Sequence, residues 1–357
     1  MTWNRNIPGL LTDDVRLRVP LNRSNPDDLR TIEVYARLVA TPNGTDKPYL
    51  AEYLTHLRAD EIVEDCEDIR RHLGIQKWAA LGQSFGGFTL LRYLSTYPES
   101  LSAGYFTGGL SAVGRSADDI YAACYEQLRA KSLEYYKRFP GDRVRFAELA
   151  ALAKKGEIAT PSGDVVCPSR LRSLGHVLGA SGGAEKLHYL LEYPHTSRAF
   201  RHDLAELLPY GGRNPLYAVI HESSYADGVV TDWSAARTLP DDFREDPTLL
   251  TGEHVMPEWF DTDQELRPWK EVADLIANHP WPKLYDPDVL RTAEVPCAAA
   301  VYHDDAYVPR KFSLETAALL PQMHAWVTTE YEHNGSNASG GAVLDRLIKL
   351  AKGEIVR

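Results

Sequence analysis

The spacing of apolar residues predicts strands at the start of the chain and a helix soon after. Residues 15–22, VRLRVPLN, and residues 31–40, TIEVYARLVA, alternate apolar and polar positions, which is typical of two antiparallel strands. Residues 47–50, KPYL, are expected to begin a third strand. From residue 51 to about residue 73 the apolar positions follow helical spacing, and Gly74 is expected to end that helix. The apolar stripe of this helix consists of Leu54, Leu57, Ile62, Cys66, Ile69 and Leu73.

A second pattern, a strand followed by a tight turn and a helix, surrounds Ser84. Residues 77–81, KWAAL, have the apolar character of a short buried strand, and a glycine-rich turn follows with Ser84 at its centre. After the turn, apolar residues return at helical spacing, at Phe88, Leu90, Leu91 and Leu94. Residues 102–110, SAGYFTGGL, then form another apolar strand that ends in glycines. Strands and helices in alternation predict a mostly parallel sheet that is covered by helices on both faces.

The pattern becomes helical from about Ser111 and stays helical to about Tyr285. Residues 116–139 predict a long amphipathic helix that Ser116 caps. Strand and helix patterns return only near the end of the chain, in residues 295–305, 325–333 and 340–354. We therefore expect an α/β core formed by residues 1–110 and 286–357, interrupted by a helical domain of residues 111–285.

Composition and charge exclude several classes of function. The chain has 357 residues and a formal net charge of −11, which disfavours nucleic acid as a partner. It has no run of about 18 consecutive apolar residues, so no membrane span is expected, and its first residues show no apolar signal segment. The four cysteines are far apart and lack metal-ligand spacing. We expect a cytoplasmic monomer or small homo-oligomer with free thiols and without a metal or cofactor.

Ser84 lies in a G-x-S-x-G pattern, residues 82–86, between the predicted strand and the predicted helix. A nucleophile on such a sharp turn occupies strained backbone, so the flanking positions must be nearly free of side chains. The N-terminus of the following helix presents backbone N–H groups that favour negative charge. The alternative is a serine in an ordinary glycine-rich loop. The strand before it and the helix after it favour the nucleophile.

A serine nucleophile needs a base and a third group that orients the base. Asp305 follows one of the last predicted strands and His333 follows the next, which is the order of acid and histidine in α/β-hydrolases. We predict Asp305 as the orienting acid and His333 as the base, with Asp304 as the alternative acid. Two other histidines fit less well because they lie inside or at the start of a predicted strand, His303 and His324.

The sequence resembles the proline iminopeptidase (prolyl aminopeptidase) family, serine peptidases of the α/β-hydrolase fold that carry a helical cap. The resemblance covers most of the chain and runs through VPLNRSNP, LGQSFGGF, YFTGGL, DPTLLTGE, VYHDDAYVP and YEHNG. It implies the α/β-hydrolase fold with residues 111–285 as the cap, and it supports Ser84, His333 and Asp305 in their roles. It also implies release of an N-terminal proline from small peptides or amides.

The resemblance also points to acidic residues of the cap. Glu222 falls where similar enzymes carry a glutamate that binds the free amine of the substrate, and a charge-assisted hydrogen bond suits that task. The alternative is an ordinary glutamate on a helix surface. Glu253 is a second candidate for substrate binding. Many of these enzymes have a cysteine three residues after the triad aspartate, whereas this chain has Val308, so its substrate pocket is expected to differ.

One part of the family's pattern is absent. Hydrolysis needs two oxyanion donors, of which the backbone N–H of Phe85 can be one. In resembling enzymes the other comes from a His-Gly-Gly-Pro-type turn after the third strand, but KPYL runs directly into the predicted helix. Connections normally take about two to six residues, so we expect a segment of about sixty residues to be missing between Leu50 and Ala51. We favour disorder of this segment over a true deletion, which would leave a hole in the sheet. A Leu50–Ala51 Cα separation of about 3.8 Å would contradict disorder.

Two other functions remain open. A broader esterase or amidase would use the same triad with a different cap pocket, and Glu222 separates it from an aminopeptidase because a neutral ester needs no amine-binding carboxylate. A catalytically impaired relative would bind a ligand under the cap, and it gains weight if the oxyanion loop is truly absent. Hydrolases with an aspartate nucleophile are excluded by Ser84.

Overall fold

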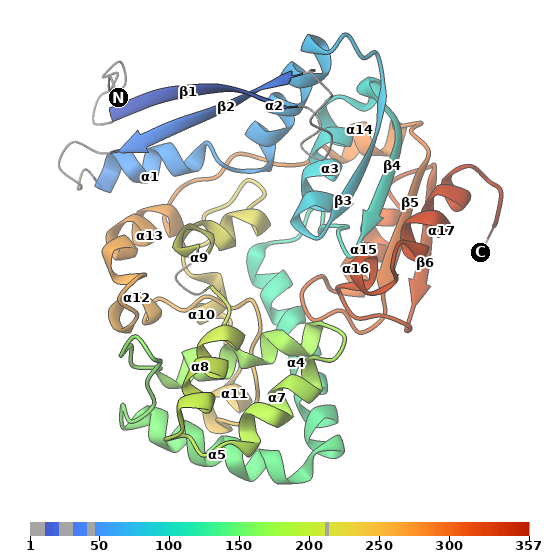
Figure 1. Ribbon diagram of the computed structural model, residues 1–357. Coiled ribbons are helices and arrows are strands. Elements are labelled where there is room, and N and C mark those ends of the chain that lie inside the picture. The colour runs from blue at the N-terminus through green and yellow to red at the C-terminus, as the bar shows by residue number, and fades with distance from the viewer. Residues whose placement is uncertain (1–10, 21–30, 41–46, 211–213, 357) are drawn as a thin grey trace. The chain divides into compact units, whose positions relative to one another are not determined.

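The computed structural model describes residues 11–20, 31–40, 47–210 and 214–356 (Figure 1). The chain divides into two units, Met1–Tyr53 and Leu54–Arg357. In the first unit, β1 (Leu11–Pro20) and β2 (Thr31–Ala40) pair in antiparallel register from Leu11 opposite Ala40 to Pro20 opposite Thr31. The two predicted strands are therefore confirmed.

The segment KPYL is helical, so the prediction of a third strand is wrong. It forms the first turn of α1 (Lys47–Thr55), and Pro48 at the start suits a helix because its missing N–H would have no partner there. Leu50 and Ala51 are consecutive residues within this helix. The expected segment of about sixty residues between them stays a prediction.

The predicted single helix of residues 51–73 is also wrong, since α1 ends at Thr55 and α2 covers Ala59–His72. Arg58 interrupts the helix with extended backbone (φ −99°, ψ 174°) and is almost fully buried. Its guanidinium donates to the carbonyl oxygens of Ala226 at 2.8 Å and Pro282 at 3.2 Å, so long-range contacts account for the break. The helix ends where predicted, because Gly74 has φ +66°.

A four-stranded parallel sheet forms the centre of the second unit. Its strands lie in the order β3 (Trp78–Gln83), β4 (Leu101–Thr107), β5 (Cys297–Tyr302) and β6 (Met323–Thr328). Because all neighbours are parallel, their carboxyl ends meet at one edge of the sheet. The residues that follow β3, β4, β5 and β6 are thereby brought together.

Helices cover both faces of this sheet, as the sequence predicts. Alternate residues of β5 point to opposite faces, and all six are buried. Cys297, Ala299 and Val301 pack in the cluster that contains α2 and α3 (Phe85–Thr96), whereas Ala298, Ala300 and Tyr302 pack against α17 (Ala342–Ala351). The remaining helices of this part are η1 (Pro98–Ser100), α14 (Pro287–Thr292), α15 (Arg310–Ala317) and α16 (Gly335–Ala338).

The helical insertion, residues 111–285, joins β4 to the elements that precede β5. It begins with α4 (Ala117–Arg138), where the Ser116 hydroxyl accepts from the Asp119 N–H and Asp119 accepts from the Ser116 N–H, a capping box that confirms the predicted start. Its buried residues from Tyr135 to Leu250 form a hydrophobic cluster. Its other helices are α5 (Pro140–Lys154), α6 (Pro168–Arg172), η2 (Ser173–Gly179), α7 (Gly183–Glu192), α8 (Arg198–Leu207), α9 (Pro215–Ile220), η3 (His221–Tyr225), α10 (Ser234–Arg237), α11 (Asp241–Glu245), α12 (Trp259–Thr262), η4 (Arg267–Trp269) and α13 (Lys270–Ala277). No helix in the described part of the chain is long and apolar enough to span a membrane.

Candidate active site

Ser84 forms a strained turn between β3 and α3. Its φ of 52° and ψ of −124° are rare for a residue with a side chain, and they turn the chain from strand to helix within one residue. The turn is held on both sides, since the Ser84 N–H donates to the Thr107 carbonyl at 3.0 Å and the Gly87 N–H donates to the Ser84 carbonyl at 2.8 Å. This is the conformation that exposes a nucleophilic serine above the end of a sheet.

Two of the glycines around Ser84 are required by close packing. A Cβ on Gly82 would lie 2.4 Å from the Gly86 carbonyl oxygen, and a Cβ on Gly87 would lie 2.5 Å from the Gly109 carbonyl oxygen. A Cβ on Gly86 would meet nothing within 4 Å. The steric demand of the turn is therefore carried by Gly82 and Gly87, and the second glycine of the G-x-S-x-G pattern is sterically free.

Asp305 and His333 form a buried hydrogen-bonded pair. Asp305 Oδ2 lies 2.8 Å from His333 Nδ1, and Asp305 Oδ1 accepts from the backbone N–H of Tyr307 at 2.9 Å and of Val308 at 3.0 Å. Burial lowers the pKa of His333, but the carboxylates of Asp305, Glu253 and Glu332 together raise it, so the net pKa lies above its ordinary value. Asp304 instead faces His303 on the surface, at 2.8 Å. The structure therefore brings Asp305, and not Asp304, to His333.

A pair of glycines after β4 connects the serine turn with the histidine. A Cβ on Gly108 would lie 2.9 Å from His333 Nδ1, whereas a Cβ on Gly109 would lie 2.9 Å from the Ser84 carbonyl oxygen. The Gln83 side chain adds a direct link, because its Nε2 donates to the His333 carbonyl at 3.1 Å. Ser84 and His333 are thus held at the same edge of the sheet.

Glu222 and Glu253 have different surroundings. The Glu222 carboxylate accepts from the backbone N–H groups of Ser234 at 3.1 Å and Ala235 at 2.9 Å, although burial still raises its pKa. The pKa of Glu253 is raised to about 7, chiefly by burial, with His333 and a hydrogen bond from Tyr217 opposing the rise and the Asp305 carboxylate adding to it. Glu253 is therefore a carboxyl group that interacts electrostatically with the Asp305–His333 pair.

The helix N-terminus after Ser84 carries the predicted oxyanion donor, the backbone N–H of Phe85. Phe85 is the first residue of α3, and the N–H groups of the first helical turn have no acceptor within their helix. The chain between β2 and α2 contains α1 but no His-Gly-Gly-Pro-type turn. The predicted donor at Phe85 thus lies at the start of α3, and the sequence between β2 and α2 has no turn of that type to carry a second donor.

Three residues around the histidine were not predicted from the sequence, namely Tyr307, His176 and Lys131. The Tyr307 ring lies perpendicular to the His333 ring, with centroids 4.8 Å apart, and its hydroxyl donates to the His176 carbonyl. Lys131 forms an ion pair with Glu332, the residue before His333. None of these three has a local sequence signal, because the contacts join segments that are far apart in the chain.

Val308 lines an apolar cavity of about 10 Å³ with Phe88 and Tyr225.

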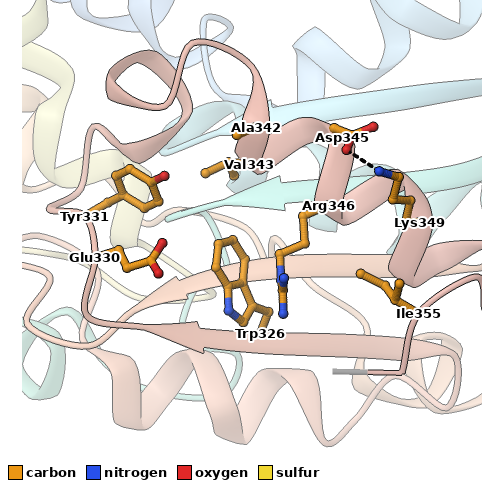
Figure 2. Close-up of a pocket in the computed structure, with 9 residues that line it drawn as sticks. All are labelled: Trp326, Glu330, Tyr331, Ala342, Val343, Asp345, Arg346, Lys349 and Ile355. Carbon is orange, nitrogen blue, oxygen red and sulfur yellow. Dashed lines mark hydrogen bonds and ion pairs between the residues drawn. The ribbon is translucent and has the colours of Figure 1, made fainter.

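Two further features lie outside this site. A surface cavity of about 420 Å³ lies between β6 and α17, and Figure 2 shows the Arg346 guanidinium stacked beside Trp326, 4.6 Å from the ring centroid. In the same cavity Lys349 pairs with Asp345 at 2.6 Å. In the described part of the chain, no group of three His, Cys, Asp or Glu side chains is arranged to hold a metal ion, and the four cysteines are free thiols.

The strained serine turn, the buried Asp–His pair and the parallel sheet define the α/β-hydrolase class. The family model described as alpha/beta hydrolase fold matches residues 40–155. Among solved structures, a bromoperoxidase from Bacillus anthracis is 15% identical, with a TM-score of 0.36 and coverage of 90% of this chain and 82% of that one.

Sequence comparison narrows the class to one family. The chain is 40% identical to a proline iminopeptidase from Aeromonas sobria over 332 residues, which are 89% of this chain and 76% of the relative. It is 26% identical to the proline iminopeptidase aneH from Aspergillus aculeatus, over 85% of this chain and 72% of that relative. The chain therefore belongs to the proline iminopeptidase family and is a hydrolase, a serine aminopeptidase of the α/β-hydrolase fold.

Proposed function

We propose that this enzyme releases N-terminal proline from small peptides and amides, with Ser84 as nucleophile, His333 as base and Asp305 as the acid that orients the base. The observation that carries the proposal is the buried 2.8 Å contact between His333 and Asp305 at the sheet edge where the strained Ser84 turn lies. The helical insertion acts as the cap of the active site. Unpaired cysteines and a net charge of −11 are compatible with a cytoplasmic monomer or small homo-oligomer that acts on small substrates.

The reaction follows from the chemistry of these three groups. Ser84 Oγ attacks the prolyl carbonyl carbon while His333 Nε2 takes the hydroxyl proton, and the developing imidazolium is stabilised by Asp305. The Phe85 N–H stabilises the oxyanion of the tetrahedral intermediate. The C–N bond then breaks as His333 gives its proton to the leaving amine. A water molecule, deprotonated by His333, hydrolyses the prolyl ester of Ser84 and releases proline.

Recognition of the free amine falls to the carboxylates of the cap. What supports Glu253 in this role is its electrostatic interaction with Asp305 and His333 and a pKa that burial raises, since a cation that binds beside it would stabilise the charged carboxylate. A bound ammonium group supplies the missing positive charge. Glu222 is the second candidate, and its carboxylate already accepts two backbone N–H groups, so part of its effect is to hold the cap backbone.

Kinetics of single variants test amine recognition. Glu253→Gln and Glu222→Gln are compared on prolyl-2-naphthylamide and on a simple neutral acyl ester. A lost charge-assisted contact costs about 1.5–3 kcal/mol, so KM for the prolyl substrate should rise roughly 10- to 150-fold while KM for the ester changes little. Equal changes on both substrates would contradict the amine-binding role and favour the broader esterase or amidase.

A catalytically impaired relative is the second candidate function. The observation that favours it is that the sequence between β2 and α2 has no His-Gly-Gly-Pro-type turn, which carries the second oxyanion donor in resembling enzymes, and that its residues 47–55 form helix α1. Such a protein would bind prolyl ligands without turning them over. Two results together would support it: the wild-type chain binds free proline in calorimetry, and it does not hydrolyse prolyl-2-naphthylamide.

A further inference from the structure

The segment that carries His333 is held largely by the helical insertion. Three consecutive residues each make a contact with it. Lys131 Nζ lies 2.6 Å from Glu332 Oε2, the His333 N–H donates to the Gly179 carbonyl at 3.0 Å, and Asn334 Oδ1 accepts from the N–H and hydroxyl of Ser181, each at 3.1 Å. The partner residues come from α4, from η2 and from the turn after η2.

Tyr307 extends this contact to the imidazole itself. Its hydroxyl donates to the His176 carbonyl in η2, and its ring stands perpendicular to the His333 ring at 89°. A Cβ on Gly179 would lie 2.2 Å from the Tyr307 ring, so the tyrosine is packed directly against η2. The ring therefore fills the space between the insertion and the histidine, and it limits how far the imidazole can turn.

The core contributes fewer contacts to the same segment. Gln83 donates to the His333 carbonyl at 3.1 Å, and Asp305 accepts from the imidazole. On the side of the insertion, the ion pair of Lys131 with Glu332 is largely shielded from solvent, since the Lys131 side chain is only 7% exposed. Removing one partner of such a pair leaves an uncompensated charge, which costs more than loss of a surface pair.

We propose that the helical insertion is a brace for the catalytic base, in which Tyr307 and Lys131 are positioning residues that hold His333 in line with Ser84. Catalysis then depends on how the helical insertion packs against the core, in addition to any role of the insertion in substrate binding. The proposal rests on the proposed function, because it takes His333 as the base.

Two variants of the brace and one matched control test the proposal. Tyr307→Phe removes only the hydroxyl that anchors the ring to η2, and Lys131→Met removes the charge that holds Glu332. Arg129→Met is the control, because Arg129 lies on the same helix and pairs with Asp242 within the insertion, away from the histidine segment. Each variant is assayed on prolyl-2-naphthylamide and on a neutral acyl ester, with circular dichroism and thermal unfolding to establish that it is folded.

Misplacement of a catalytic group by about 1 Å can cost up to about 100-fold in rate, so both brace variants should lose about 10-fold or more in kcat on both substrates. KM should change less than about threefold, and Arg129→Met should match the wild type. The proton NMR signal of the His333 Nδ1–H bonded to Asp305 should shift or broaden in the brace variants only. Wild-type kcat with an unchanged NMR signal in both brace variants, or an equal loss in Arg129→Met, would overturn the brace. An inactive wild type, or an active His333→Ala, would instead overturn the proposed function.

Discussion

Ser84 keeps a positive φ because hydrogen bonds and the packing of its neighbours fix the backbone conformation at this position. The neighbouring strand β4 and the following helix α3 are both hydrogen-bonded to it, and Gly82 and Gly87 are packed against backbone. Strain of this kind costs on the order of 1–3 kcal/mol and persists where the surrounding structure determines the conformation. The strain places the hydroxyl at the sheet edge where the Asp305–His333 pair lies.

Loss of any triad group should abolish hydrolysis without unfolding the protein. Ser84→Ala and His333→Ala should each lower kcat by about 10⁴-fold or more, and Asp305→Asn should also lose nearly all turnover. Asp304→Asn is the matched control, since Asp304 contacts only the surface residue His303 and should leave kcat unchanged. Steady-state kinetics on prolyl-2-naphthylamide measures all four. An inactive Asp304→Asn beside an active Asp305→Asn would show that the acid is assigned wrongly.

Glu253 should make stability fall as pH rises. Its folded-state pKa of about 7 lies above the ordinary value of 4.5, so the folded state favours the protonated carboxyl. That contribution is complete below about pH 4.5 and is lost as pH rises through 7. Glu253→Gln should therefore be more stable than the wild type at pH 8, by up to about 2–3 kcal/mol, and the difference should shrink at pH 5. Urea unfolding at the two pH values measures it, and a difference independent of pH would contradict the assignment.

The candidate triad residues could be placed from the sequence, but the contacts that surround them from the helical insertion could not. Ser84 and His333 each follow a strand whose apolar pattern is local, so their positions could be inferred from residues nearby. The surroundings of Glu222 and Glu253 depend on contacts across the insertion. The sequence therefore named both glutamates but did not distinguish the one that caps backbone N–H groups from the one near the triad.

At the level of elements, the errors fall where a tertiary contact overrides local spacing. Leu57, Ile69 and Leu73 fit a helical stripe in the sequence, yet they are exposed in the structure. The buried face of α2 consists of Ala59, Val63 and Glu67, because Arg58 breaks the helix and resets its register. A single buried arginine with partners more than 150 residues away leaves no local signal.

The turn between β3 and α3 offers a matched pair of glycine substitutions. Gly87→Ala should unfold the turn and abolish activity, because its Cβ would lie 2.5 Å from the Gly109 carbonyl oxygen. Gly86→Ala should keep the fold and gain up to about 1 kcal/mol, since alanine favours a helix over glycine. Thermal unfolding and kcat for the two variants check this. Equal destabilisation by both substitutions would contradict the packing described for the turn.

At the level of the whole molecule, β3 forms one end of the parallel sheet in the described part of the chain. In the structure β3 is an end strand of the four-stranded sheet, and Leu81 is half exposed. The relative from Aeromonas sobria is a longer chain, since the same match covers 89% of this chain and 76% of the relative. The segment KPYL was expected to be a strand because its four residues are too few to show a period, whereas in the structure it continues as helix to Thr55.

Because the sequence lacks the His-Gly-Gly-Pro-type turn, the chemical step of hydrolysis should be slow. Loss of one oxyanion donor costs about 10²–10³ in kcat, so this enzyme should turn over prolyl-2-naphthylamide that much more slowly than the Aeromonas sobria relative assayed beside it. KM should be similar, because an oxyanion donor acts in the transition state and contributes little to binding of the substrate. A kcat within about tenfold of the relative would show that another group in this chain supplies the second donor.

The most direct test of the central claim compares prolyl-2-naphthylamide with its N-acetyl form, on the wild type and on Ser84→Ala. We predict that the wild type hydrolyses the free prolyl amide, that N-acetylation lowers kcat/KM by about 10-fold or more because the charged amine is lost, and that Ser84→Ala has neither activity. Equal hydrolysis of both substrates would contradict an aminopeptidase. Activity retained in Ser84→Ala would contradict the serine mechanism.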